Sequence, residues 1–272
     1  MIYQLSKEQI YWRRHKIQDL STSGQDGFKS FKQEYPCNPT EAFQMSGMNS
    51  FISSETVIRA RKTVSEKYGP LIIGVDPARF GDDRTGIIRR RGRCAFGLES
   101  YTKKDTMEIV GIVHMIIQKE KPDKVFVDEG GLGSGVVDRL IELGHSKVVV
   151  GINAGNTALD QRKYFNKRAE MWGEMAEWLV RGGAQIPDDN ALHSDLCSIK
   201  YKHDSNGRIQ MEAAEDMKKR GVRSPDLASA LYLTFSQPVN QSHDLQSEQV
   251  ASNIMSSFNS IQNLKEGRKW HI

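Results

Sequence analysis

The sequence predicts an α/β fold with a mixed central sheet flanked by helices. Three short apolar runs are typical of buried strands, and they cover residues 71–76, 124–128 and 148–150. Amphipathic segments of helical length separate and follow these runs, and a predicted β-hairpin comes after the first of them. Strands that alternate with helices are typical of an α/β domain, and the hairpin makes the sheet mixed.

The N-terminal region has helical signals but no apolar pattern sufficient for a core of its own. Residues 6–20 have the pattern of an amphipathic helix, and a polar stretch interrupted by prolines follows. Ser53 is a suitable cap for a short helix through Arg61. We therefore interpret residues 1–55 as a linker and packing segment, which precedes a domain over residues 56–238.

The first half of this domain contains one hairpin and two helices with clear end signals. The hairpin has its strands at residues 85–88 and 94–100, around an Arg-Gly turn. A capping box, in which an acidic acceptor is followed three residues later by Glu108, begins a helix over residues 105–118. A second helix covers residues 136–143 and ends at a glycine.

The second half of the domain contains a long helix, another hairpin and a final helix. Methionine and tryptophan residues line one face of the helix at residues 167–180. A hairpin over residues 198–212 turns at an Asn-Gly pair. The final helix begins at Ser224 and Pro225, with serine as the cap and proline in the first position. The polar residues 239–272 are interpreted as a mobile tail or a segment for a partner.

The composition is that of a water-soluble protein with a mildly basic surface. The net charge of +4 suits a polyanionic partner without requiring one. No stretch approaches the roughly 18 apolar residues of a membrane span, and the N-terminus lacks the apolar core of a secretory signal. The three cysteines are far apart and odd in number, which argues against a disulfide framework or a zinc site. We therefore expect an intracellular protein.

Three aspartates stand where predicted elements begin or end. Asp76 and Asp128 close apolar strands, and Asp226 lies at the start of the final helix. Ligand sites of α/β sheets lie beyond the carboxyl ends of strands, and the first turn of a helix stabilises a negative charge. If the three carboxylates converge, they suit Mg²⁺ or Mn²⁺, and a pair of such ions is the usual apparatus for cutting phosphodiester bonds.

A purely structural role for each aspartate is the alternative interpretation. Asp76 precedes Pro77 and suits a turn, Asp128 suits the cap of a glycine-rich turn, and Asp226 suits any helix start. Three ionised carboxylates in one place repel one another, so that one must take up a proton or a divalent cation must neutralise them. Asp83 is close enough in sequence to be a further candidate ligand.

Other chemistries lack their motifs in this sequence. The glycine-rich residues 130–135 lack the Gly-Lys-Ser/Thr ending of a phosphate-binding P-loop. Their glycines also lack the spacing of a dinucleotide-binding site. The seven histidines are scattered without metal-ligand spacing. No arrangement of serine, cysteine and histidine competes with the aspartates as a catalytic site.

Five short segments, in this order, resemble the C-terminal nuclease half of the large terminase subunits of tailed bacteriophages. They lie at residues 31–43, 74–85, 127–135, 166–171 and 218–228. The resemblance covers most of residues 31 to 236. It implies a ribonuclease H-like fold and a metal-dependent endonuclease that cuts double-stranded concatemeric DNA during viral genome packaging.

The resemblance also implies cofactors, partners and roles for particular residues. Asp76, Asp128 and Asp226 are the implied ligands of two Mg²⁺ or Mn²⁺ ions. Contacts to DNA phosphates give affinity rather than sequence preference. The basic residues implied for such contacts are Arg79, Arg84, Lys200, Lys202, Lys218 and Lys219. The small terminase subunit and the portal are the implied protein partners, and the implied location is the host cytoplasm.

One departure from the family and two alternative functions remain at this point. A complete large terminase carries an ATPase motor with a Walker A motif, and that motif does not occur here. Residues 1–55 would then be the remnant of the segment joining motor to nuclease. Because residues 74–76 and 83–85 loosely resemble a phosphate-binding hairpin, an actin-like or sugar-kinase-type ATPase is the first alternative. A catalytically inactive docking module of the packaging machine is the second.

Overall fold

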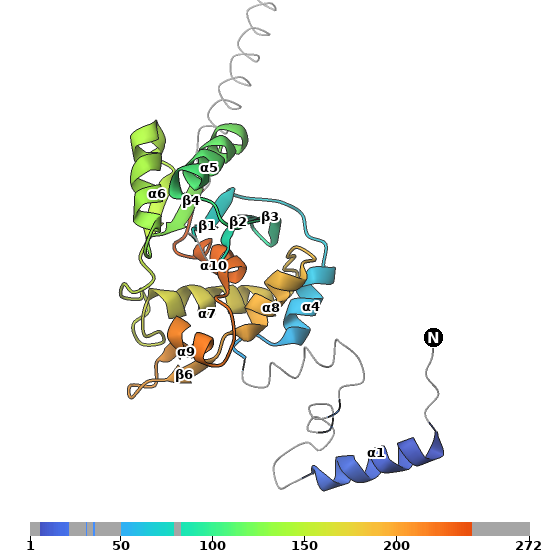
Figure 1. Cartoon of the computed structure of the whole chain (residues 1–272). Helices are drawn as coiled ribbons and strands as arrows, with labels where there is room; N and C mark the ends of the chain where they lie inside the picture. The colour runs from blue at the N-terminus through green and yellow to red at the C-terminus, as the bar shows by residue number, and fades with distance from the viewer. Residues whose placement is uncertain (1–5, 22–30, 32–34, 36–49, 79–82, 241–272) are drawn as a thin grey trace, which may run out of the picture.

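A five-stranded mixed sheet forms the centre of the molecule (Figure 1). The computed structural model describes residues 6–21, 31, 35, 50–78 and 83–240. The strand order is β3-β2-β1-β4-β5, where β1 is antiparallel to β2 and parallel to β4. The strands are β1 (Ile72–Asp76), β2 (Thr85–Arg91), β3 (Cys94–Tyr101), β4 (Lys124–Asp128) and β5 (Val149–Ile152). The structure therefore confirms the mixed α/β sheet.

Helices cover both faces of this sheet. On one face lie α5 (Thr106–Glu120) and α6 (Gly133–Leu140), which continues into the π-helical turn η1 (Ile141–His145). On the other face lie α7 (Lys167–Val180) and α10 (Asp226–Leu233), with α4 (Ser54–Lys62) and α8 (Asn190–Ser198) packed beyond them. A small hairpin of β6 (Tyr201–His203) and β7 (Ile209–Met211) is followed by α9 (Ala214–Lys219). Helix α1 (Lys7–Asp19) lies near the N-terminus.

Strand alternation divides the apolar residues into two cores. In β1, Ile73 and Val75 point toward α5 and α6 and belong to an aliphatic cluster. Ile72 points to the opposite face, together with Phe126 of β4, and joins a larger cluster. This larger cluster contains the buried methionine and tryptophan side chains of α7, as the sequence predicts.

Helix α10 lies directly on the backbone of β1 and β2 because two glycines remove the side chains between them. A Cβ atom on Gly74 would lie 1.9 Å from the carbonyl oxygen of Ala230, and one on Gly86 would lie 3.0 Å from that of Asp226. The distance at Gly74 is too short for any side chain, and the distance at Gly86 is at the lower limit of real Cβ contacts. The two glycines therefore fix where the N-terminal end of α10 meets the sheet.

Most predicted elements are present, and the differences have local causes. Helices α8 and α9 were not predicted, although Asp189 caps α8 through the Leu192 N–H. Ser198 was expected to begin a hairpin strand, but it ends α8. The prediction of Ser224 as the cap of the final helix is wrong. Pro225 holds the cap position without a side-chain bond, because a carboxylate from α8 accepts the free N–H groups instead.

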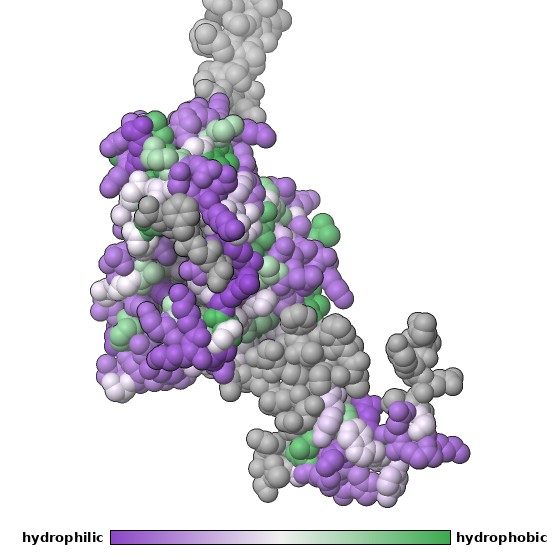
Figure 2. All heavy atoms as spheres, viewed as in Figure 1, coloured by the Kyte–Doolittle hydropathy of each residue, from purple (hydrophilic) through white to green (hydrophobic). Residues whose placement is uncertain are grey.

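The described N-terminal segments differ in their packing. Helix α1 buries none of its residues, whereas Ile52 and Val57, near the expected boundary at residue 55, belong to the main core. Among the described residues no helix is long and apolar enough to cross a membrane. The face shown in Figure 2 is largely hydrophilic, with hydrophobic residues in small separate groups. The proposed tail at 239–272 lies outside the described residues apart from its first two positions.

Candidate metal centre

Asp76 and Asp128 occupy equivalent positions at the carboxyl ends of neighbouring parallel strands. Val75 pairs in register with Val127. The Cα atoms of the next residues, Asp76 and Asp128, are therefore separated by one strand spacing, ~4.8 Å. Because alternate residues of a strand share a face, Asp76 projects on the side of Gly74, which is the side covered by α10. Asp128 projects to the same side, two residues after Phe126 of the larger core. The β-sheet thus brings these two carboxylates together.

Asp226 reaches the same place from the first turn of α10. Its backbone lies against Gly86, and Gly86 is the residue paired with Asp76 across β1 and β2. The side chain is only 5% exposed, and its Oδ2 accepts a hydrogen bond of 2.7 Å from the backbone N–H of Arg84. The hydroxyl of Ser224 also bonds to this carboxylate. Asp226 is therefore held in a defined position beside the strand ends.

The electrostatics of the three carboxylates reflect their proximity. The pKa of Asp76 is raised well above its ordinary value, first by burial and then by the negative charges of Asp128 and Asp226. Asp83 adds a smaller effect of the same sign. Burial also raises the pKa of Asp128 and of Asp226, although hydrogen bonds to backbone N–H groups oppose it in both cases. The four carboxylates thus form one region of concentrated negative charge.

The carboxylate oxygens of this region are suitable ligands for a hard divalent cation, but in their present positions the side chains do not enclose one. In the described ranges, no three carboxylate, imidazole or thiol groups are close enough together to form a ready metal site. Mutual repulsion keeps ionised carboxylates apart when no cation lies between them. A bound Mg²⁺ or Mn²⁺ would remove that repulsion and is coordinated by oxygen ligands of this kind.

Sequence reasoning missed a buried aspartate that supports this region. Asp195 of α8 is 7% exposed, and its Oδ2 accepts a hydrogen bond of 3.0 Å from the N–H of Leu227 in the first turn of α10. Both of its carboxylate oxygens lie 3.2 Å from Nη2 of Arg84. Burial raises the pKa of Asp195 to about 7, against the opposing effect of Arg84. No local sequence pattern identifies this contact, because it joins residues far apart in the chain.

A cation and a hydroxyl pair lie next to the carboxylates, and they too were not predicted. Arg168, in the first turn of α7, lowers the pKa of Asp128 by its charge, and its Nη1 donates a 2.6 Å hydrogen bond to the carbonyl oxygen of Glu212. The side chain of Ser229 on α10 lowers the pKa of Asp76 and that of the buried Tyr232. Ser229 and Arg168 thus act on two of the carboxylates from α10 and α7.

The basic residues proposed for DNA contacts are distributed over three places. Arg79 lies outside the described residues, and the Arg84 guanidinium is bound to Asp195. Lys200 and Lys202 are at β6, and Lys218 and Lys219 are exposed at the end of α9. Lys219 pairs with Asp216 at 2.8 Å. No contact in the structure tests a role for these residues in DNA binding, which stays a prediction.

The hairpin of β6 and β7 adjoins the carboxylate region through Glu212. The carbonyl oxygen of this residue accepts the hydrogen bond from Arg168, and its Oε2 accepts one of 3.3 Å from the backbone N–H of Lys200. The first basic residue of the hairpin is thus linked through Glu212 to Arg168, whose charge acts on Asp128. A surface that leads from the carboxylates to a basic hairpin suits a polyanion next to a bound cation.

Comparison with known proteins gives a clear result for structure but not for sequence. No protein-family model matches the sequence, and no curated protein matches it. The nuclease domain of the large terminase subunit gp2 of bacterial virus Sf6 matches with a TM-score of 0.64 and 19% identity, covering 70% of this chain and 100% of that one. A mutant form of the same domain with manganese and beta-thujaplicinol matches with a TM-score of 0.63 and 20% identity, covering 70% of this chain and 100% of that one.

A second phage gives the same result. The large terminase nuclease of thermophilic phage G20c with bound magnesium matches with a TM-score of 0.52 and 17% identity, covering 70% of this chain and 98% of that one. These likenesses, together with the strand order and the helices on both faces, confirm the predicted architecture. The chain has the ribonuclease H-like fold of the nuclease domains of phage large terminase subunits.

Proposed function

We propose that the chain is a divalent-metal-dependent endodeoxyribonuclease that cuts double-stranded DNA during viral genome packaging. Asp76, Asp128 and Asp226 are its proposed metal ligands and catalytic residues, with Asp83 as a further candidate. The observation that carries this proposal is the placement of Asp76 and Asp128 at the ends of neighbouring parallel strands, with Asp226 in the first turn of the helix packed on them, on a fold that phage terminase nucleases share. The magnesium and manganese in the G20c and Sf6 structures support Mg²⁺ or Mn²⁺ as the cofactor.

The metal ions, when bound as a pair, would activate a water molecule and stabilise the leaving 3′ oxygen of the cut strand. The protein residues then have the task of holding the ligands in place. Asp195 with Arg84 holds the first turn of α10, from which Asp226 extends, and Ser229 favours the ionised form of Asp76. Rigid support of this kind matters because small displacements of a ligand weaken catalysis strongly.

DNA binding is proposed for the basic surface beside the carboxylates. The charge of Arg168 lowers the pKa of Asp128, and we add Arg168 to the candidates for contact with the phosphate next to the cut. Lys200 and Lys202 follow along the hairpin, and Lys218 lies exposed on α9. Phosphate contacts set affinity and register but little sequence preference. The small terminase subunit, the portal and the cytoplasm of the host remain the proposed partners and location.

A plasmid-nicking assay tests the proposed function directly. Supercoiled plasmid is incubated with the wild-type chain and with Asp128→Asn, in Mn²⁺ or Mg²⁺ and in excess chelator. We expect nicked and linear products from the wild type, no products with chelator, and at least about a 100-fold lower rate for the variant, since even residues that only support metal ligands cost 10–100-fold. Asp138→Asn, an exposed change on α6, is the matched control and should cut at the wild-type rate.

Two results would contradict the proposal and separate the alternatives. If wild type and Asp128→Asn nick DNA equally, the carboxylates are not the catalytic site. If the folded wild type cuts no DNA but binds ATP tightly, an actin-like or sugar-kinase-type ATPase is favoured. If it neither cuts DNA nor binds Mn²⁺ at millimolar concentration, the docking module is favoured.

A further inference from the structure

The carboxylate of Asp195 on α8 contacts two groups that also lie next to Asp226. Its Oδ2 accepts a hydrogen bond of 3.0 Å from the backbone N–H of Leu227, the residue that follows Asp226. Both of its oxygens lie 3.2 Å from Nη2 of Arg84. The backbone N–H of the same Arg84 donates to Oδ2 of Asp226 at 2.7 Å. The four residues therefore form a closed ring of contacts at the start of α10.

Both groups that Asp195 contacts are natural partners of the Asp226 carboxylate as well. The first N–H groups of a helix have no partner within the helix, and an aspartate accepts bonds from N–H groups close to it in sequence. Burial raises the pKa of Asp226, and the charge of Arg84 is among the effects that lower it, so the guanidinium acts on this carboxylate. Arginine forms strong, often bidentate pairs with carboxylates. Without Asp195, both groups would compete with a cation for the oxygens of Asp226.

The ion pair of Asp195 and Arg84 is enclosed, which makes its charges strong in their effects. Asp195 is 7% exposed, and the side chain of Arg84 is 17% exposed. Nε of Arg84 is buried and has no hydrogen-bond partner among the residues described. Charges that water screens poorly interact strongly, and removal of one partner leaves the other uncompensated. Loss of the Asp195 charge would therefore leave an enclosed cation beside Asp226.

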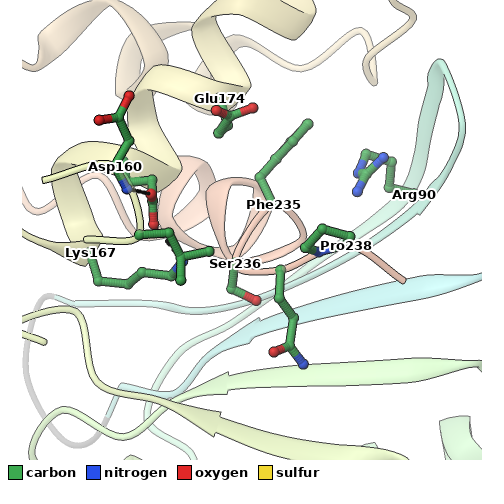
Figure 3. A pocket seen from close by; sticks show the side chains of 10 residues that line it. Arg90, Asp160, Lys167, Glu174, Phe235, Ser236 and Pro238 are labelled. Atoms are coloured by element: carbon green, nitrogen blue, oxygen red, sulfur yellow. Dashed lines mark hydrogen bonds and ion pairs between the residues drawn. The ribbon is translucent and has the colours of Figure 1, made fainter. Parts of the chain in front are cut away.

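Helix α10 is also held by contacts that do not involve Asp195. The glycines beneath it let its backbone lie directly on the sheet. At its C-terminal end, Arg90 of β2 donates to the hydroxyl and carbonyl oxygens of Thr234 at 2.9 and 2.6 Å. Figure 3 shows this arginine beside Phe235, at a pocket that adjoins the end of the helix. We therefore expect α10 to stay in place when Asp195 loses its charge but keeps its shape.

We infer that Asp195 is a positioning residue that binds the Arg84 guanidinium and the Leu227 N–H, and so keeps the Asp226 carboxylate available to a divalent cation. The inference rests on the proposed function, because it takes Asp226 to be a metal ligand. Asp195 itself is not a ligand in this arrangement, since its oxygens face Arg84 and Leu227. Arg84 is then the counter-ion of Asp195 and not a contact to DNA.

Mn²⁺ binding by the full chain, measured by calorimetry without DNA, tests this inference. Asp195→Asn keeps the shape of the side chain and an oxygen for the Leu227 N–H, but it removes the charge that holds Arg84. We expect this variant to bind Mn²⁺ about 10–100-fold more weakly, as for other residues that support metal ligands. The double variant Asp195→Asn with Arg84→Gln should bind about threefold or more tightly than Asp195→Asn, because the competing cation is gone.

Two single variants complete the comparison. Arg84→Gln alone should bind Mn²⁺ as tightly as the wild type or more tightly, because it removes a cation near Asp226 and keeps the backbone N–H that bonds to this ligand. Arg90→Gln is the matched control, since it removes an arginine from the other end of α10. It should lower the thermal midpoint and leave the affinity for Mn²⁺ unchanged. Circular dichroism shows which variants are folded.

The possible failures of this inference and of the proposed function give different results. Wild-type affinity in Asp195→Asn, or a double variant that binds no more tightly than Asp195→Asn, overturns the inference and leaves the proposed function intact. If Asp195→Asn does not fold, Arg84→Gln decides, and weaker binding than in the wild type overturns the inference. A folded wild type that binds no Mn²⁺ at millimolar concentration contradicts the proposed function itself, and the inference falls with it.

Discussion

The two faces of the central sheet are built for different purposes. Toward α5 and α6 the strands present mainly aliphatic side chains, among them Val75 and Val127, which are completely buried, together with the buried Arg89, which pairs with Glu120 of α5. Toward α7 and α10 the same strands carry apolar residues such as Ile72 and Phe126, glycine where α10 lies closest, and then Asp76 and Asp128 at their ends. The first face therefore serves mainly stability, while the second combines stability with concentrated negative charge.

This difference shows how an acidic region can be tolerated in a stable fold. The repulsion among the carboxylates is a cost that folding must offset, and the apolar burial on the α5 and α6 face contributes to that offset without a comparable cluster of like charges. Because successive side chains of a strand point to opposite faces of the sheet, the neighbours Val75 and Asp76 lie on different faces. The faces should therefore respond differently to substitution.

The largest expected effect comes from a methyl group added where α10 lies on the sheet. Gly74→Ala should prevent folding, because the new Cβ would lie 1.9 Å from the carbonyl oxygen of Ala230. Gly111→Ala on α5 is the matched control, since nothing lies within 4 Å of its Cβ, and it should stabilise by about 0.5–1 kcal/mol. Circular dichroism and thermal melting measure both. A folded Gly74→Ala protein with an unchanged midpoint would show that the close contact of α10 is not required.

A smaller effect is expected in the aliphatic core. Leu140→Ala on α6 should lower the free energy of unfolding by about 3 kcal/mol, because the side chain is completely buried. At temperatures where the variant remains folded, DNA nicking should be unchanged, since α6 packs on the face away from the carboxylates. Denaturant titration and the nicking assay measure the two quantities separately. A folded variant that has lost nicking would mean that the faces are coupled and not separate.

The smallest effect is a pH dependence that arises from both faces. Burial, and then the charge of His114, hold the pKa of His145 below its ordinary value of 6.5. The unfolded chain therefore binds the proton more readily, so the free energy of unfolding should fall as pH drops from about 6.5 through the folded pKa. His193, on the other face, is shifted in the same direction by burial and by Arg61.

Substitution separates the two histidines. His145→Gln should remove part of the dependence of the thermal midpoint on pH between about 7 and 5, and leave the part due to His193. His15→Gln, a change in the exposed helix α1, is the control and should leave the whole dependence in place. An identical pH dependence in wild type and His145→Gln would show that the contact between His114 and His145 has no effect on stability.

Local signals in the sequence predicted elements well where those signals were strong. The capping box at Asp105 and Glu108 is present at the start of α5, with both of its hydrogen bonds. Helix α7 begins and ends at the residues predicted, because its apolar face and the following glycines are unambiguous. Helix α8 was missed because it is short and lies between a polar loop and a hairpin signal.

The candidate site could be predicted only in part, because its geometry depends on contacts between distant residues. The element ends identified Asp76, Asp128 and Asp226 as candidates, but their approach depends on β1 lying beside β4 and under α10. Asp195 supports the site through bonds to Arg84 and to the first turn of α10, and no spacing or motif indicates these bonds. The role of all these residues in catalysis stays a prediction until the nicking assay is done.

The glycines beneath α10 have a consequence for the divergence of such chains. Apolar residues of a core can be exchanged for one another when their volumes are compensated, but no compensation exists for a residue whose only suitable side chain is a hydrogen atom. We therefore expect relatives that keep the carboxylates to keep Gly74 as well, even where the surrounding residues have all changed. At identities as low as those observed here, this glycine offers a criterion for recognising distant homologues.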